Sequence, residues 1–167
     1  TGFVQSLRSV EPGNGADDAI LGGDGRDRIM GGQGRDRIDG GTGADLIFGD
    51  HGEVSYLGPD YDGSTESGLD GLVTLDRLQS VHTEARFGAA DAITDDAGDD
   101  IIVGGQGGDR IDAGAGQNIV FGDHGRIQGL DTGINAPVGD PDAGKLDDDY
   151  QVQVLGRVES IDWGSVN

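Results

Sequence analysis

The chain has 167 residues and a mass of 17.1 kDa, which allows one domain or two small modules. Its 11 Lys and Arg residues stand against 32 Asp and Glu residues, a net charge of −21, so nucleic acid is a poor partner and cations are good ones. Glycine supplies 34 residues, which disfavours a conventional closely packed globule. The absence of cysteine excludes disulfides and thiolate metal sites. No apolar run reaches the roughly 18 residues of a membrane span, so we expect no membrane insertion.

A nine-residue repeat dominates the chain and is written in two series. After a leading strand or cap segment in 1–12, residues 13–54 hold the first series, in which 22–30 read GGDGRDRIM and 31–39 read GGQGRDRID. A loop with linking strands, 55–85, separates it from the second series, 86–127, and an acidic loop with a closing strand follows in 128–167. Both series end in Phe-Gly-Asp-His-Gly. The flanking runs also recur, as Leu7 to Val10, Leu78 to Val81 and Val158 to Ile161, so we expect a segment of a longer array.

Each place in the repeat has a physical reason. Glycines at places 1, 2 and 4 allow a sharp turn with carbonyl oxygens directed inward. Places 7 to 9 form a minimal strand, and its middle residue faces a thin core. That residue is a branched aliphatic in all eight copies: Ile20, Ile29, Ile38, Ile47, Ile93, Ile102, Ile111 and Val120. The pattern predicts an all-β fold with two short parallel β-roll (β-helix) segments in tandem, capped and linked by additional strands that pack on the ends of the rolls.

Place 6 carries the chemistry. Two nonapeptides make one coil of 18 residues, so Asp18 stacks on Asp36 and Asp27 on Asp45 at the inter-strand spacing of about 4.8 Å. Carboxylates at that spacing repel by roughly 3 kcal/mol at an effective dielectric constant of about 20. Calcium accepts six to eight oxygen ligands in loose geometry, whereas magnesium requires a tight octahedron and zinc prefers nitrogen or sulfur. The pattern therefore predicts calcium sites between stacked turns.

These repeats resemble the RTX (repeats-in-toxin, hemolysin-type calcium-binding) family, whose consensus is G-G-x-G-x-D-x-U-x. The resemblance implies that each ion binds two place-6 side chains and carbonyl groups from places 2 and 4 of one turn and 1 and 3 of the other, with about four to six ions in all. The place-6 ligands are then Asp18, Asp27, Asp36, Asp45, Asp91, Asp100, Asp109 and Asn118. The remaining ligands are Asn14, Ala16, Gly23, Gly25, Gly31, Gly32, Gln33, Gly34, Gly40, Thr42, Gly49, His51, Asp96, Gly98, Gly104, Gly105, Gln106, Gly107, Ala113, Ala115, Gly122 and His124.

The last turn of each series departs from this pattern. Val54 and Ile127 stand where the final Asp belongs, and Asp50 and Asp123 stand at place 2, where they can compensate. With these turns included, the resemblance implies three sites in each roll, the third of the first roll joining 31–36 to 49–54.

No catalytic motif accompanies the repeats, so we expect no enzyme. The prediction is a calcium-binding structural segment of a secreted or cell-surface protein, of adhesin, filament or surface-layer type, which folds and stiffens in extracellular calcium. Its partners are calcium ions, neighbouring repeats of the same chain, and a surface glycan or protein target. Two alternatives remain open: an accessory or secretion module of an extracellular enzyme, and a module that binds surface polysaccharide.

Overall fold

The computed structural model describes residues 6–57, 74–81, 88–129 and 155–160. Within these residues the chain forms strands and turns but no helix, which confirms the all-β prediction. The described residues accordingly include no helix that could cross a membrane.

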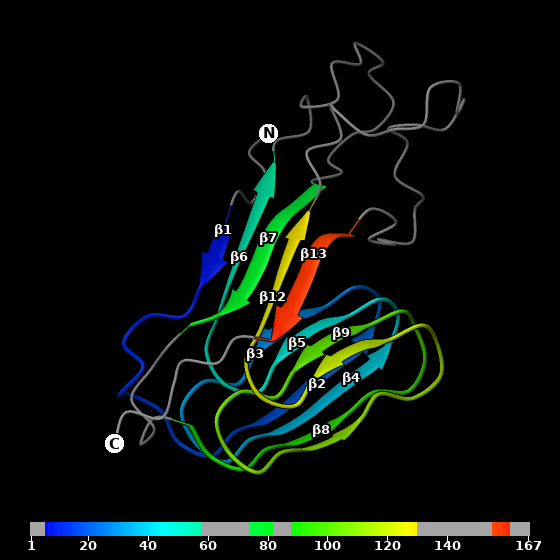
Figure 1. The fold of residues 1–167 in the computed structure, drawn as a ribbon. Coiled ribbons are helices and arrows are strands. Elements are labelled where there is room, and N and C mark those ends of the chain that lie inside the picture. The colour runs from blue at the N-terminus through cyan, green and yellow to red at the C-terminus, as the bar shows by residue number, and fades with distance from the viewer. Residues whose placement is uncertain (1–5, 58–73, 82–87, 130–154, 161–167) are drawn as a thin grey trace, which may run out of the picture.

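Two parallel four-stranded sheets form the faces of the roll (Figure 1). In spatial order, the first sheet contains β10 (Arg110–Asp112), β8 (Ala92–Thr94), β4 (Arg37–Thr42) and β2 (Ala19–Asp24). The second contains β11 (Ile119–Phe121), β9 (Ile101–Val103), β5 (Leu46–Phe48) and β3 (Arg28–Met30). The predicted parallel β-roll is thus confirmed, and the strands pair at the predicted 18-residue step, as Ile20 with Ile38 and Ile29 with Ile47.

The core between the two sheets consists of the place-8 aliphatics. Five of them form one buried cluster: Ile29, Ile38, Ile47, Ile93 and Ile102. Ile20 and Ile111, in the outer coils, are only partly buried against this cluster. Val120 differs from the prediction because it is 45% exposed. It lies on β11, which pairs only with β9 within the described residues, so no further coil covers it.

The structure adds that the two roll segments stack directly on each other. Ile38 of β4 pairs with Ile93 of β8, and Ile47 of β5 pairs with Ile102 of β9. The segments therefore form one continuous solenoid, and the residues between them leave the roll and return to it. This contact between segments was not foreseen from the sequence.

One turn of the solenoid is built from two separate pieces of chain, 49–51 and 88–91, which we call the composite turn. On one side, the N–H groups of Gly31 and Gly32 donate to the carbonyl oxygens of Phe48 and Gly49, both at 3.0 Å. On the other side, the N–H of Asp50 donates to the carbonyl oxygen of Gly104 at 3.2 Å. Residues 88–91 then supply the second half of the turn, and they lie against residues 106 and 107 of the next coil.

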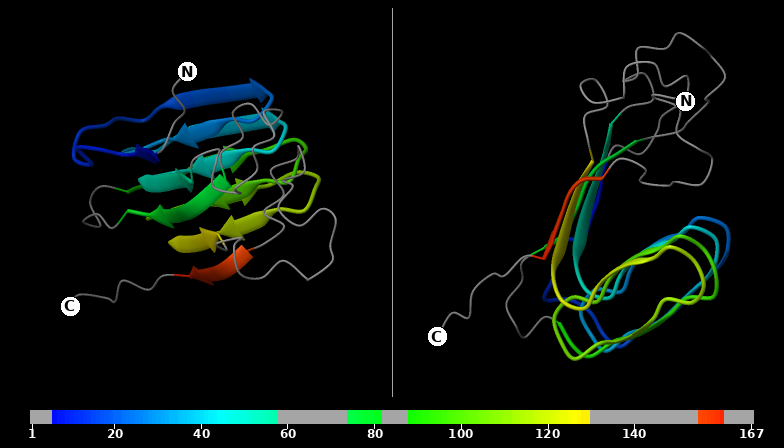
Figure 2. Two further views of the ribbon diagram at one scale, coloured as in Figure 1. Left: turned by 90° about the horizontal axis from the view of Figure 1, so that it is seen from above. Right: turned by 45° about the vertical axis from the view of Figure 1, so that its right-hand side comes forward.

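The remaining strands form a five-stranded antiparallel side sheet. Its order is β1 (Ser6–Arg8), β6 (Gly52–Leu57), β7 (Thr74–Ser80), β12 (Gly125–Gly129) and β13 (Leu155–Ser160). We expected these strands to pack on the ends of the roll, but they extend from its side (Figure 2). The reason is that β6 and β12 begin directly after the closing turns. Gly52 and Gly125 allow this exit, because a Cβ at either position would meet the ring of Phe48 or Phe121 at about 2.6 Å or closer.

An apolar cluster joins the side sheet to the roll. Its buried members are Phe48, Val54, Leu78, Val103, Phe121 and Ile127. Val54 and Ile127, which replace the expected aspartates, are fully buried here. Their side chains thus belong to the core of the side sheet and not to a metal site.

The repeated units add strands to all three sheets at the same rate. The first unit supplies β2 and β4 to one face of the roll, β3 and β5 to the other, and β6 and β7 to the side sheet. The second supplies β8 and β10, β9 and β11, and β12 and β13 in the corresponding places. Each unit therefore contributes two strands to each sheet.

The apolar cluster should be essential for the attachment of the side sheet. Leu78 is fully buried there, so Leu78→Ala should lower the free energy of unfolding in calcium by about 2–5 kcal/mol, measured by urea denaturation. Val158→Ala is the matched control, because Val158 occupies the corresponding place on β13 and is 44% exposed. Equal losses in the two variants would contradict the assignment of Leu78 to the core.

Candidate metal centres

The place-6 residues form two columns, one along each edge of the roll. The first column contains Asp18, Asp36, Asp91 and Asp109, and the second contains Asp27, Asp45, Asp100 and Asn118. Within each column, the backbone N–H of one member donates to the side-chain Oδ1 of the next member, at 2.8–3.0 Å. These hydrogen bonds hold one side-chain oxygen of each member after the first in a fixed place.

The columns run without interruption through the boundary between the segments. Asp36 is followed by Asp91, and Asp45 by Asp100, although the members of each pair are 55 residues apart. From the sequence, sites were expected only within each roll, so these two steps were not foreseen. In particular, 31–36 was expected to join 49–54, whereas the structure completes that turn with residues 88–91, so Asp91 stands where Val54 was expected.

The second carboxylate oxygen is the decisive feature of each column. The Oδ2 atoms of six members are buried and have no hydrogen-bond partner: Asp27, Asp36, Asp45, Asp91, Asp100 and Asp109. A buried carboxylate oxygen without a partner is costly, and buried charges are normally paired or bound to a metal. Burial raises the pKa of Asp36, Asp45, Asp100 and Asp109, and it raises the pKa of Asp91 to about 7. The columns thus fit bound cations.

Glycine at place 1 lies directly against oxygen atoms of its own turn and of the next coil. A Cβ on Gly31 would lie 2.5 Å from Oδ2 of Asp36 and against the carbonyl oxygen of Gly49 in the next coil. The same environment, with one place-6 carboxylate and one carbonyl oxygen, surrounds Gly22, Gly49 and Gly104. The carbonyl groups in question belong to Gly40, Gly49, Gly104 and Gly122, all expected as ligands. Each position is therefore flanked by two oxygen atoms of the kind that a hard cation binds.

Several of the expected carbonyl ligands also accept backbone hydrogen bonds. The carbonyl oxygen of Thr42 accepts from the N–H of Gly25, that of Gly49 from Gly32, and that of His51 from Val81. The carbonyl oxygen of Gly104 accepts from the N–H of Asp50, that of Ala115 from Gly98, and that of Asp96 from Ala115. A carbonyl oxygen has two lone pairs, so this contact leaves one for a metal ion. For His51, the bond to Val81 ties the composite turn to the residue that follows β7.

The closing turns differ in their burial. Asp50 in the composite turn is buried, its Oδ2 accepts a hydrogen bond from the N–H of Gln106, and its Oδ1 has no hydrogen-bond partner. Burial, together with the charges of Asp91 and Asp109, raises its pKa to about 8. Asp123, the counterpart in the second closing turn, is exposed. The structure therefore brings Asp50, but not Asp123, into a buried group of carboxylates.

The step between Asp100 and Asn118 also stands apart. The side-chain amide of Asn118 donates to the carbonyl oxygen of Ala113, one of the expected ligands. A hydrogen-bond donor thus lies where the other steps have a second carboxylate.

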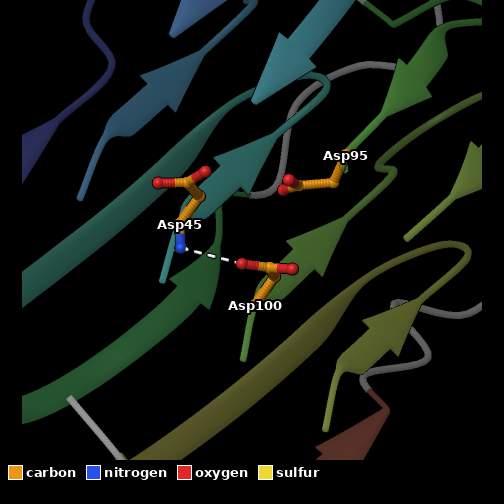
Figure 3. Close-up of side chains that lie close together, drawn as sticks. All are labelled: Asp45, Asp95 and Asp100. Atoms are coloured by element: carbon orange, nitrogen blue, oxygen red, sulfur yellow. Dashed lines mark hydrogen bonds between the residues drawn. The ribbon is translucent and has the colours of Figure 1, made fainter. Parts of the chain in front are cut away.

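Asp95 is a candidate ligand that the repeat pattern did not reveal. It is buried, and one oxygen of its carboxylate lies within 4.8 Å of one from Asp45 and one from Asp100 (Figure 3). Burial, together with the charges of Asp100 and Asp45, raises its pKa to about 7. Its signal in the sequence is an Asp at place 1, where the complete copies of the repeat have Gly.

Comparison with known families agrees with this geometry. The RTX calcium-binding nonapeptide repeat, in four copies, matches residues 12–52 and 88–126. Over these residues, the chain belongs to the RTX calcium-binding repeat family. No curated protein and no solved structure matches it. The matched residues contain both aspartate columns and the composite turn, and we call this calcium-binding repeat region the RTX roll. The oxygen-flanked positions beside Gly22, Gly31, Gly49 and Gly104 lie within it.

A methyl group on Gly31 should come between the two oxygen atoms that flank this position. Gly31→Ala places a carbon between Oδ2 of Asp36 and the carbonyl oxygen of Gly49, so the calcium concentration for half-maximal folding should rise on the order of tenfold. Gly108→Ala is the matched control, because a Cβ there meets nothing within 4 Å. Calcium titrations followed by circular dichroism compare the two variants, and the same midpoint in both would contradict the placement of the ion.

Without calcium, the RTX roll should be less stable at higher pH. The pKa values of about 8 for Asp50 and about 7 for Asp91 and Asp95 lie above the ordinary value of 3.8. Their contribution to stability is fully present below about pH 4 and is lost as the pH rises through about 7 to 8, because the folded chain must then hold buried charges. We expect more β-sheet signal in EDTA at pH 5 than at pH 8, measured by circular dichroism. A signal that grows with pH would contradict this account.

Proposed function

We propose that this chain is a calcium-dependent structural segment of a secreted or cell-surface protein, of adhesin, filament or surface-layer type, with no catalytic role. The observation that carries the proposal is the set of buried Oδ2 atoms without hydrogen-bond partners along both edges of the roll. Five of these side chains, those of Asp36, Asp45, Asp91, Asp100 and Asp109, have their other oxygen fixed by a backbone N–H. The chain's acidic groups are therefore organised around cations, and not around a substrate.

Calcium supplies the attraction that the fold otherwise lacks. Neighbouring carboxylates in a column repel by roughly 3 kcal/mol per step at an effective dielectric constant of about 20. A divalent ion between them converts this repulsion into attraction and also binds the inward carbonyl groups. The two columns offer six such steps, three in each, of which the Asn118 step has a single carboxylate. We therefore propose four to six calcium ions.

The same coupling favours an extracellular location. When ligands come together only in the folded chain, the free energy of ion binding is also free energy of folding. Low cytosolic calcium would leave such a chain unfolded and ready for export, whereas the millimolar calcium outside the cell would fold it. The net charge of −21 favours the unfolded chain still further when calcium is absent.

The sheet arrangement supports a role as a stiff spacer in a repetitive protein. The second unit stacks on the first through all three sheets, with β4 paired to β8, β5 to β9 and β7 to β12. Calcium bound at the columns would fix this stacking along its length. A surface glycan or another protein could then be held at a distance from the cell by a rigid element.

Removal of calcium tests the proposal. The purified chain should show β-sheet circular dichroism and a small radius of gyration in millimolar calcium, and excess EDTA should abolish the β-sheet signal and expand the chain. Magnesium at the same concentration is the control and should not restore the fold, because it requires tighter octahedral coordination. An unchanged spectrum and radius in EDTA would refute calcium-dependent folding.

A further inference from the structure

One step of the second column has three carboxylates instead of two. The side chains of Asp45, Asp95 and Asp100 converge on the same gap between neighbouring coils (Figure 3). Asp45 and Asp100 are successive members of the column, linked by the bond from the Asp45 N–H to Oδ1 of Asp100 at 3.0 Å. Asp95 comes from place 1 of the same turn as Asp100, and its Oδ1 accepts the N–H of Asp96 at 2.9 Å.

All three carboxylates have an oxygen that requires a partner. Asp45 is 2% exposed, Asp95 5% and Asp100 0%, and the Oδ2 atom of each is buried without a hydrogen bond. Three such atoms gathered in one place would repel one another strongly in any fold that left them bare. The arrangement therefore points to a cation between them.

Asp95 replaces a neutral ligand with a charged one. At Gly22, Gly31, Gly49 and Gly104, the oxygen facing place 1 from the next coil is a backbone carbonyl oxygen. At Gly40 it is Oδ2 of Asp95, which would lie 2.6 Å from a Cβ on that glycine. The gap beside Gly40 thus gains a formal negative charge that the four regular gaps do not have.

The next step of the column has one carboxylate fewer than a regular step. Asn118 stands at place 6 after Asp100, and its amide donates to the carbonyl oxygen of Ala113. The outer step, from Asp100 to Asn118, thus has one carboxylate, whereas the step from Asp45 to Asp100, at which the two segments meet, has three. The residues that converge there, Asp45 on one side and Asp95 and Asp100 on the other, are at least 50 positions apart in the chain.

We propose that Asp45, Asp95 and Asp100 form a three-carboxylate cation site that binds calcium more tightly than the regular steps, accepts a trivalent lanthanide in its place, and fastens the two segments of the roll together. The proposal rests on the calcium-dependent folding proposed above. Affinity at oxygen-ligand sites rises with the number of charged ligands, and three carboxylates neutralise a trivalent ion in full. This site binds calcium before the regular steps do. Its ion links Asp45, which precedes the excursion of the chain between 52 and 87, to Asp95 and Asp100, which follow it.

Titration of four proteins tests the site: the unaltered chain, Asp95→Asn, Asp95→Gly and Asp112→Asn. Asp95→Asn keeps the shape and removes the charge, whereas Asp95→Gly restores the residue that place 1 has in the regular repeats. Asp112 is exposed and is not among the expected ligands, so Asp112→Asn is the control for the loss of one charge. Isothermal titration calorimetry with calcium, and separately with terbium, measures the tightest step, and native mass spectrometry counts the ions bound.

Both Asp95 variants should weaken the tightest step by about tenfold or more for calcium, and by a larger factor for terbium, with one ion fewer at low loading. Asp112→Asn should remain within about twofold of the unaltered chain. An unchanged tightest step in Asp95→Asn would overturn the inference even if calcium still folds the chain. If the unaltered chain binds a tight ion without folding, and Asp95→Asn does not bind that ion, the site is upheld and the proposed function is refuted. An unaltered chain that binds no ion would refute both.

Discussion

Repulsion between stacked carboxylates is the constraint on which this fold depends. A parallel roll with an 18-residue coil places identical side chains directly above one another, so an aspartate at place 6 necessarily becomes a column. In Asp36, Asp45, Asp91, Asp100 and Asp109, one carboxylate oxygen accepts a backbone N–H and the other is buried without a hydrogen bond. The core between the columns is thin, since it consists of one branched aliphatic per nonapeptide. The burial of these aliphatic side chains therefore contributes too little free energy to offset the repulsion between the carboxylates.

The composite turn shows how the roll combines this chemistry with a second structural layer. The chain leaves after His51, forms two strands of the side sheet, and returns at Gly88 to finish the same turn. Asp91 then continues the column begun by Asp18 and Asp36, so the excursion does not break the sequence of carboxylates. Phe48 and Phe121 mark the two exits, and both pack into the apolar cluster under the side sheet. The ring of each also occupies the space that makes glycine necessary four residues later.

Much of this structure follows from the repeat, because local periodicity determines local stacking. The register of Asp27 on Asp45, the parallel strands and the buried isoleucines could all be predicted from a period of nine. The pairing of Asp36 with Asp91 could not, since the nine-residue period stops at residue 51 and resumes only after 85. Val54 was interpreted as a defective ligand because the pattern was extended past the exit of the chain. Its burial beside Leu78 shows that a new period, that of an antiparallel strand, had already begun.

Asp95 was missed for a related reason. A consensus identifies ligands by the places that most copies share, and Asp95 departs from the consensus at a place where glycine is expected. Only the contact with the preceding coil reveals that its side chain reaches the gap beside Gly40. The neutral Asn118 gains meaning in the same way, because its amide contact with Ala113 is visible only in three dimensions.

The equal contribution of two strands per unit to each of the three sheets has a geometric consequence. Two strands advance a sheet by about 10 Å, so the roll and the side sheet lengthen in step. If each unit added one strand more to one layer than to the other, the mismatch would accumulate as shear between the layers. Such a protein would be limited to a few units. Commensurate layers remove that limit, and the height of the column becomes proportional to the number of copies encoded. Gene duplication could then set the reach of the molecule in increments of one unit, without redesign of any interface.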